Sequence, residues 1–536
     1  MINRTFLALL IVIFWSTSLS FGQVVYEHTS YITIYDFLDD MANHHLININ
    51  SSVKPYSNKH IALKLKEVNE QKEILNKTQK EDLEFFLNYY DVKEGNKLFD
   101  IKRRPLFYYQ DSLLKMAINP VVGADYFING INDFYHRWIG GEVFGTIGKH
   151  FGFYTSLRDN TESKKLVGEE IKTQRMGVNY HSRNDYSEMR GGFTYDWNWG
   201  SVALIKDHLV WGNNYNGSNI FSGRTPSFAQ LKLNISPVKW FDFNYVHGWL
   251  VSEEIDSLRS YTFQNGTRQV FYEKYLAANF FTFTPMKHLN ISVGNSVVYS
   301  DIGIHPAYLI PVFFYKSIDH QQTGTMGQFN YTGQNAQMFL DVSSRQIKKL
   351  HLYSSLFIDE IGLFNIFDKS NQSNWLSFKL GSRFSNIANQ NISLTAEYTR
   401  TNPITYNHFI PTTTFESNKY NLGHYLGDNA RELYFSLAWK PIRGLNIIVD
   451  YLKAEIGTDY IYTGVGVSGL GLPFMDKVEW KNSTFTMKVK YELMNGVYTH
   501  ISYSMANISG DSLNVYTPDV FRGKTNTISG GISYGF

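Results

Sequence analysis

Apolar and polar residues alternate along most of the chain from about residue 117 to the C-terminus. Between Phe485 and Leu493, large apolar residues hold the odd positions, and threonine, lysine and glutamate hold the even ones. A period of two places the two sets on opposite faces of a strand. Asn495-Gly496 follows, which is typical of a tight hairpin turn, and the alternation then resumes. One apolar and one charged face fit a transmembrane β-barrel with lipid outside and water inside. A soluble β-sandwich is the alternative, but it would not need so long a series.

A repeated turn allows the strands to be counted. Pro237-Val238-Lys239, Pro285-Met286-Lys287 and Pro441-Ile442-Arg443 share the order proline, apolar residue, base, and a new strand pattern follows each. Looser copies lie near residues 147–151 and 346–350, and further turns are expected near 185, 389 and 495. Longer polar segments separate them, including 210–227, 301–334, 401–429, 456–480 and 507–525. Eight short turns and nine longer loops predict eighteen strands, with 188–209 taken as one long strand.

The last residues also predict a membrane barrel. Counting back from Phe536, every second residue is apolar, aromatic or glycine as far as Ile528. A chain that ends on an aromatic residue within such a strand is typical of the closing strand of an outer-membrane barrel. We therefore expect the protein in the outer membrane of a bacterium, with both barrel ends on the periplasmic side.

Residues 23–116 have a different period. Ile34, Phe37, Leu38 and Met41 recur every three or four residues, as on one face of a helix. Ser57 is expected to cap a second helix, and Thr78 with Glu81 to form the capping box of a third. We predict a small periplasmic helical domain over 23–116, beneath or inside a barrel that spans 117–536.

The N-terminus resembles an export signal. Arg4 precedes an apolar run from Phe6 to Trp15, and Ser20-Phe21-Gly22 offers small residues at a cleavage site. Residues 1–22 are therefore predicted to be a signal peptide. The chain has no cysteine, which excludes a lipid-anchoring cysteine, disulfides and thiolate chemistry.

Composition and charge narrow the function classes. Aromatic residues make up 16% of the chain, and there are 40 glycines but only 13 prolines, as interface girdles and close strand contacts would require. The formal net charge of +2 gives no sign of a nucleic-acid partner. After the signal, the longest apolar segment of note is Pro306–Tyr315, which is too short for a membrane helix and is expected to fold into the barrel mouth or pack on its rim.

Three groups of residues resemble the Wzi-type capsule assembly proteins. They are Tyr35 to Met41 with Lys54-Pro55-Tyr56-Ser57 and Ile61 to Leu65, then Trp211-Gly212-Asn213-Asn214-Tyr215-Asn216-Gly217-Ser218-Asn219-Ile220-Phe221-Ser222, and Ile304-His305-Pro306-Ala307-Tyr308-Leu309-Ile310-Pro311. Where that family tends to read Trp-Gly-Pro-Gly, this chain has Asn213 and Asn214. The resemblance implies an eighteen-stranded barrel with a periplasmic helical domain. It also implies a protein that holds capsular or other surface polysaccharide at the outer membrane.

Candidate ligand-binding residues come from one segment. Sugars are bound by aromatic faces and by amide or charged groups. The candidates are Trp211, Asn213, Asn214, Tyr215, Asn216 and Arg224. The alternative is a Gly/Asn-rich turn with a structural tryptophan.

A second set of residues carries charges on the inward faces of strands. These residues are expected to pair across the lumen, and the alternative is an ion-selective pore. They are Glu432, Lys440, Asp450, Lys488, Lys490, Glu492 and His500.

The function hypothesis is an attachment protein without catalysis. No Gly-x-Ser-x-Gly, His-Glu-x-x-His or phosphate-loop motif occurs, so no enzyme activity, cofactor or metal is predicted. The expected partners are surface polysaccharide, outer-membrane lipid and a periplasmic protein that contacts the helices. The alternative function is a channel or transporter with the helical domain as its hatch, and a weaker one is an accessory barrel of a secretion or motility machine.

Overall fold

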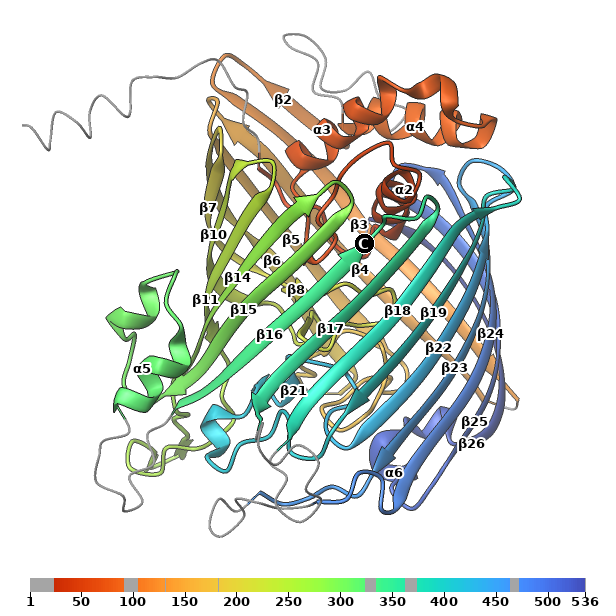
Figure 1. Cartoon of the computed structure of the whole chain (residues 1–536). Helices are drawn as coiled ribbons and strands as arrows, with labels where there is room; N and C mark the ends of the chain where they lie inside the picture. Colours follow the sequence, from red (N-terminus) through yellow and green to blue (C-terminus); the bar gives the residue numbers. More distant parts are fainter. Residues whose placement is uncertain are drawn as a thin grey trace, which may run out of the picture.

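The computed structural model describes residues 24–90, 105–130, 132–181, 183–322, 334–361, 374–462 and 472–535, and it contains a closed barrel of eighteen antiparallel strands (Figure 1). Each strand pairs with its neighbour along the chain, and the last pairs with the first, with Tyr534 opposite Val122. The fold class and the strand number predicted from the sequence are confirmed. The wall strands are β3 (Leu114–Asn129), β4 (Asn132–Ile147), β5 (Phe151–Glu162), β6 (Asp185–Trp197), β7 (Gly200–Asp207), β10 (Phe228–Val238), β11 (Phe241–Leu250), β14 (Lys274–Met286), β15 (Leu289–Ser300), β16 (Gln334–Ser344), β17 (Leu350–Glu360), β18 (Trp375–Ile387), β19 (Ile392–Thr401), β22 (Ala430–Trp439), β23 (Leu445–Gly457), β24 (Val478–Met494), β25 (Val497–Ser509) and β26 (Gly523–Tyr534).

The outer face of the wall is apolar. Ile139, Phe193, Leu204 and Ile532 all point outward and are more than half exposed. A closed barrel leaves no sheet edge, and a wall with exposed large apolar residues is stable only in lipid, which locates the protein in the bacterial outer membrane. Phe536, from which the alternation of the closing strand was counted back, lies outside the described residues. The signal peptide predicted for residues 1–22 also lies outside them.

One predicted turn is wrong, although the strand count is right. We expected a turn near residue 185 and one long strand over 188–209, whereas β6 and β7 are separate strands joined at residues 198–199. The stretch 163–184 is instead a long loop. The short turn at 198–199 therefore takes the place of the one expected near 185, and the number of strands stays eighteen. The error arose because Trp197 and Trp199, which flank the turn, continue the aromatic alternation of a strand.

Three helices precede the wall: α2 (Ile32–Asn43), α3 (Asn58–Asn69) and α4 (Lys77–Tyr90). The predicted apolar stripe of α2 is buried, and Ser57 caps α3 by accepting the amide hydrogen of His60. The capping box predicted at Thr78 and Glu81 is wrong. Asn76 and Gln79 form it instead, each side chain accepting the other's backbone N–H at 3.0 and 3.1 Å. Asparagine and glutamine satisfy the same geometry as the expected pair.

The N-terminal segment enters the barrel. In Figure 1, α2 lies within the short-turn end, and α3 and α4 lie outside that end. Strand β1 (Val53–Lys54) pairs inside the lumen with β8 (Val210–Trp211), which pairs with β9 (Phe221–Ser222). A short strand, β2 (Phe107–Gln110), then pairs with β3. The first wall strand begins at Leu114, close to the expected boundary at 117, and the division into two domains stays a prediction. None of the helices among the described residues is long and apolar enough to cross a membrane.

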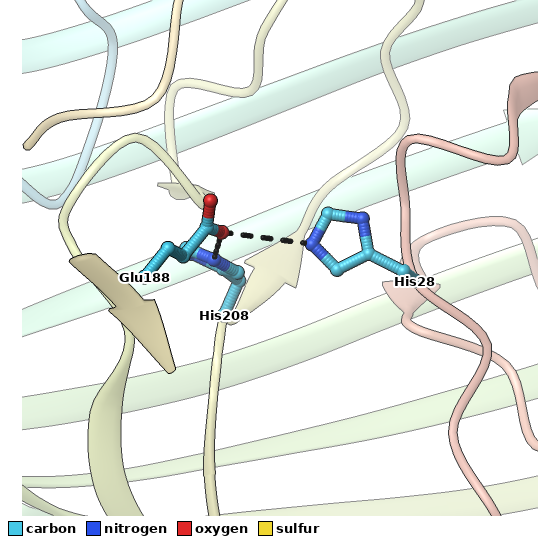
Figure 2. A group of neighbouring side chains, drawn as sticks. All are labelled: His28, Glu188 and His208. Carbon is cyan, nitrogen blue, oxygen red and sulfur yellow. Dashed lines mark hydrogen bonds and ion pairs between the residues drawn. The ribbon is translucent and has the colours of Figure 1, made fainter. Parts of the chain in front are cut away.

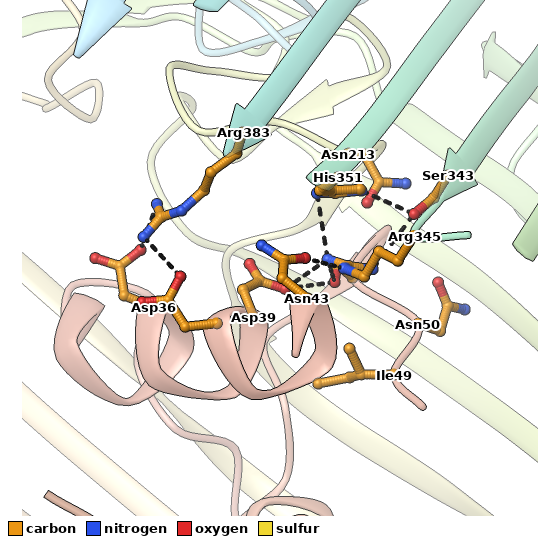
Figure 3. Close-up of polar contacts among 12 residues, drawn as sticks. Asp36, Asp39, Asn43, Ile49, Asn50, Asn213, Ser343, Arg345, His351 and Arg383 are labelled. Atoms are coloured by element: carbon orange, nitrogen blue, oxygen red, sulfur yellow. Dashed lines mark hydrogen bonds and ion pairs between the residues drawn. The ribbon is translucent and has the colours of Figure 1, made fainter. Parts of the chain in front are cut away.

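Buried ion pairs join α2 to the wall (Figure 3). Arg345, between β16 and β17, donates to Asp39 at 2.9 Å, to Ser51 at 2.8 Å and to Asn43 at 2.7 Å. Arg383 of β18 lies 3.3 Å from both Asp36 and Asp40. These contacts satisfy wall cations with carboxylates from one helix, as buried charges require.

Among the contacts of the described residues, no ion pair joins two of the seven inward-facing charges named from the sequence, so the predicted pairing with one another across the lumen is wrong. Among the seven named from the sequence, Lys440 pairs with Asp82 of α4 at 3.0 Å, and Glu432 accepts from Asn216 at 2.9 Å. His500 lies 3.7 Å from Asp125 of β3. The physical reason is proximity, because the N-terminal segment and inward loops fill the space between opposite walls and supply nearer partners.

The segment Pro306–Tyr315 packs against the outer face of the wall. Tyr308 and Tyr315 are fully buried against Tyr245, Tyr275 and Tyr299 of three neighbouring strands. It precedes α5 (Tyr315–Gln322), which lies beside the barrel in Figure 1. This agrees with the expected packing on the rim and not with folding into the mouth.

Replacing Arg345 should loosen α2. Arg345→Met removes the only guanidinium bonded to Asp39 among the described contacts, and breaking a buried pair costs about 3–5 kcal/mol. We expect hydrogen exchange over residues 32–43 to rise by at least a hundredfold, as measured by mass spectrometry in detergent. The matched control is Arg259→Met, which breaks the ion pair of the half-exposed Arg259 with Asp256 in the loop between β11 and β14 and should change the same segment little. Equal exchange in both variants would contradict the role of Arg345.

Candidate functional site

The six predicted ligand-binding residues lie inside the barrel, in a segment that turns inward between β7 and β10. Four are buried, and Asn214 and Tyr215 are half-buried. Trp211 has no exposed surface and stacks on Phe280 of the wall with ring centroids 5.3 Å apart. The six residues are Trp211, Asn213, Asn214, Tyr215, Asn216 and Arg224.

Wall carboxylates hold the first part of this segment. The backbone N–H of Asn213 donates to Asp341 at 2.9 Å. The N–H groups of Tyr215 and Asn216 donate to the two oxygens of Glu397 at 2.8 and 3.0 Å, and Lys379 lies 3.2 Å from the same carboxylate. The N–H groups of this segment thus bind carboxylates of the barrel wall. That these residues also bind a ligand stays a prediction.

Arg224 has a different position, beneath the long loops. Its guanidinium donates to the backbone oxygens of Thr173 and Ile171 at 3.1 and 2.6 Å, and it lies 5.1 Å from the ring centroid of Tyr420. Burial lowers the pKa of Arg224 to about 10. Arg224 therefore holds the loop 163–184 over the lumen, and it also lines the cavity described next.

A cavity of about 370 Å³ opens among the long loops. Its volume falls within the usual range for small-molecule sites, about 300–1,000 Å³. The lining comes from residues 169–172, 403–429 and 458–460, from Arg224 and Glu254, from the end of β23 and from α6 (Leu513–Tyr516). Buried aromatic and aliphatic residues form one part, among them Tyr406, Phe415 and Tyr425, while exposed charged residues form another: Glu169, Glu170, Glu254, Lys419 and Asp459.

Hydrogen bonds hold the floor of the cavity in place. The Tyr406 hydroxyl donates to the backbone oxygen of Asn219 at 2.7 Å, which joins the floor to the inward segment. Asp428 accepts the N–H groups of Tyr406 and Asn407 at 2.8 and 3.2 Å. Tyr425 donates its hydroxyl hydrogen to Glu432. The floor is therefore a fixed platform of tyrosine rings.

Burial shifts the pKa values of titratable groups in the cavity. It raises the pKa of Asp428 to about 7. It lowers the pKa of Lys172 to about 8, with Arg224 adding to the effect. Lys172 also lies 5.4 Å from the ring centroid of Tyr516. Lys172 and Asp428 thus give the cavity a basic and an acidic group beside its tyrosine rings.

Sequence reasoning missed most of this lining. Residues 169–172, 403–429 and 456–460 come together only because the barrel places their loops at one end. The available signal was the set of long polar segments, of which 401–429 and 456–480 supply much of the lining. No histidine, serine or cysteine is among the described lining residues, so no nucleophile and imidazole base are paired there.

Comparison with known proteins identifies the fold. No family model and no curated protein sequence matches the chain. A solved structure does: Wzi from Escherichia coli aligns over 96% of this chain and 100% of its own, with a TM-score of 0.57 and 11% identity. The fold is similar to that of Wzi. The resemblance predicted from the sequence is thus confirmed as a likeness of fold. Wzi is described as an outer-membrane protein involved in group 1 capsule assembly and as a carbohydrate-binding β-barrel.

More distant matches include OccD3 (OpdP) of Pseudomonas aeruginosa and OccAB2 of Acinetobacter baumannii. OccD3 aligns over 79% of this chain and 90% of its own, at 12% identity and a TM-score of 0.41. OccAB2 aligns over 78% and 97%, at 10% identity and a TM-score of 0.42.

The loop that holds Asp428 should respond to pH. Because its folded-state pKa of about 7 lies above the usual 3.8, the folded loop binds the proton more tightly than the open loop does. Protection of residues 402–429 from hydrogen exchange, corrected for intrinsic rates, should therefore fall as pH rises from about 4 to 7, by at most about tenfold per unit. Asp428→Asn should flatten this dependence. Asp301→Asn, at an exposed aspartate in another loop, should leave it unchanged. A pH dependence that persists in Asp428→Asn would assign it to another group.

Proposed function

We propose that the protein binds surface or capsular polysaccharide at the outer face of the outer membrane and catalyses no reaction. The observation that carries the proposal is the cavity of about 370 Å³ at the long-loop end, which combines a tyrosine floor with a charged rim. Long loops of outer-membrane barrels face the cell exterior, and short turns face the periplasm. A cavity at that end meets polysaccharide and not periplasmic solutes.

The chemistry of the lining suits a sugar segment. Tyrosine rings offer apolar faces for the C–H face of a sugar ring, and their hydroxyls offer hydrogen bonds. Tyr460 and Tyr516 are half-buried at the cavity, with Lys172 between the loops that carry them. The volume suits a short stretch of a polymer, whose remaining length would extend away from the cell surface.

The six residues predicted from the sequence take two roles in this proposal. Arg224 lines the cavity and contributes to the ligand site directly. Trp211, Asn213, Asn214, Tyr215 and Asn216 hold the inward segment on which the cavity floor rests, and they contribute through position. Helices α3 and α4 would face the periplasm, where a protein partner would reach them.

Cavity variants should weaken glycan binding. Tyr460→Ala removes a ring face, and Lys172→Met removes a charge from the lining at similar length. We expect each to raise Kd about fivefold, which corresponds to about 1 kcal/mol, as measured by calorimetry with polysaccharide extracted from the surface of producing cells. The matched control, Tyr261→Ala, changes an exposed tyrosine of the β12 (Tyr261–Phe263) and β13 (Gly266–Arg268) hairpin. Absence of binding by the unmodified protein would refute the proposal.

A closed lumen should give no steady current. We expect the intact protein to show no stable openings in a planar bilayer, because α2, β1 and the segment 208–227 occupy the lumen. Deletion of residues 24–90 should produce a current above that of the intact protein. Deletion of residues 257–269, the tip of the exposed hairpin, serves as the control and should produce none. Steady conductance of the intact protein would instead support the channel or transporter.

A further inference from the structure

Two histidines and one glutamate from three distant segments meet inside the barrel (Figure 2). His28 lies on the N-terminal segment, Glu188 in β6 and His208 just after β7. One ligand atom from each lies within 4.8 Å of the other two. His208 Nε2 is 3.1 Å and His28 Nε2 is 3.9 Å from the same oxygen of Glu188, Oε1. His28 and His208 are buried, and Glu188 is partly so.

The contact between His208 and Glu188 requires a cation, either a proton or a metal ion, between the two side chains. The Nδ1 atom of His208 lies 3.2 Å from the backbone oxygen of Thr225, and since a carbonyl only accepts, Nδ1 carries the hydrogen. In the neutral ring, Nε2 then presents a lone pair to a carboxylate oxygen at hydrogen-bond distance. Two acceptors that face each other need a cation to separate them. A proton would satisfy this pair, but it would not use the second imidazole.

Each of the three side chains is also held by a group behind it. Thr225 orients His208, and Arg158 lies 3.7 Å from Oε2 of Glu188, which leaves Oε1 toward the imidazoles. The backbone N–H of Ser30 donates to Nδ1 of His28 at 3.1 Å, and the Ser30 hydroxyl also contacts this atom. A ring that binds a metal ion through Nε2 carries its hydrogen on Nδ1, so metal binding would replace the amide donation by a bond from Nδ1 to the Ser30 hydroxyl. The contact with Thr225 already fixes the metal-binding tautomer of His208, and such outer contacts are characteristic of metal ligands.

The arginines near the three side chains are themselves paired with carboxylates. Arg190 is paired with Asp207 through two hydrogen bonds of 3.0 Å, so this pair is neutral. Arg158 is shared between Glu188 and the ring of Trp138, whose centroid lies 5.0 Å from the guanidinium carbon. Glu188 therefore remains the carboxylate directed at both imidazoles.

We propose that His28, Glu188 and His208 bind a divalent transition-metal ion of the zinc type, which cross-links the N-terminal segment to the barrel wall. Two imidazoles and one carboxylate form a known zinc ligand set, which leaves the fourth position to water. Zinc bonds of about 2.0–2.2 Å require the ligand atoms to lie about 3.3 Å apart. Only the His28 side must therefore close, by about 0.6 Å toward Glu188 and by up to about 1.5 Å toward His208. The ion would join residues separated by 160 and 20 positions in the chain.

The test uses the full mature protein in detergent, stripped of metal by a chelator and dialysed against zinc chloride. We expect about one zinc per chain by mass spectrometry of the metal. His28→Ala and His208→Ala should each bind zinc at least about a hundredfold more weakly. The matched control is His150→Ala, at a partly buried histidine bonded to the backbone of Asp196 outside the cluster, and it should bind zinc as the unmodified protein does. Heat-dependent migration on gels checks that every variant is a folded barrel.

A second measurement decides the question without variants. Crystals of the unmodified protein soaked in zinc should give an anomalous scattering peak between the two imidazoles and Glu188. A peak elsewhere, zinc binding that His28→Ala and His208→Ala retain, or no binding at all would overturn the proposal. In the last case the His208–Glu188 contact is a proton-sharing pair.

Discussion

A lumen of eighteen strands is too wide for the side chains of its own wall to fill, and the rest of the structure depends on this constraint. The inward faces of the strands carry charged and amide groups, which are costly to bury unless each finds a partner. The chain meets both demands with its own segments. The N-terminal residues enter from the short-turn end, the segment 208–227 enters from the long-loop end, and the two meet in the small sheet of β1, β8 and β9. As a consequence, these two segments make many hydrogen bonds and ion pairs with the inward-facing side chains of the wall.

The same constraint explains which features the sequence could predict. Outward positions alternate with inward ones along every strand, so the period of two was visible, and the short turns have compact signatures that allowed the count of eighteen. Helix α2 and the Ser57 cap are local features, and both were predicted correctly. The turn at 198–199 was missed because its flanking tryptophans continue the strand pattern, and the true capping box at Asn76 lay two residues before the expected one.

The candidate site was harder to predict because its contacts join distant residues. Asn213 is bound by Asp341, and Tyr215 by Glu397, across 128 and 182 positions. Composition identified the Trp211–Asn219 segment as rich in groups that bind sugars, but the same groups are those that a polar lumen needs from a filling segment. Aromatic and amide residues therefore do not distinguish the two roles in a barrel. The cavity lining depends on which loops the closed wall brings together, and alternation alone carries no information about that.

The filling and the cavity are mechanically continuous, and this bears on how a ligand at the surface would be sensed below. Val53 of the N-terminal segment pairs with Trp211, and the inward segment continues to Asn219, whose backbone oxygen accepts from Tyr406 of the cavity floor. The backbone of Tyr406 in turn is bonded to Asp428. Each link is a buried hydrogen bond or packed contact, so a displacement of the floor must be taken up by the inward segment or by the loop above it. The inward segment is fixed at Glu397 and Asp341 on the wall, and most of the loop 402–429 is buried, whereas the loop 251–273 is largely solvent-exposed. Adjustment on ligand binding should therefore fall on the exposed loop 251–273, and the N-terminal segment would remain a rigid support.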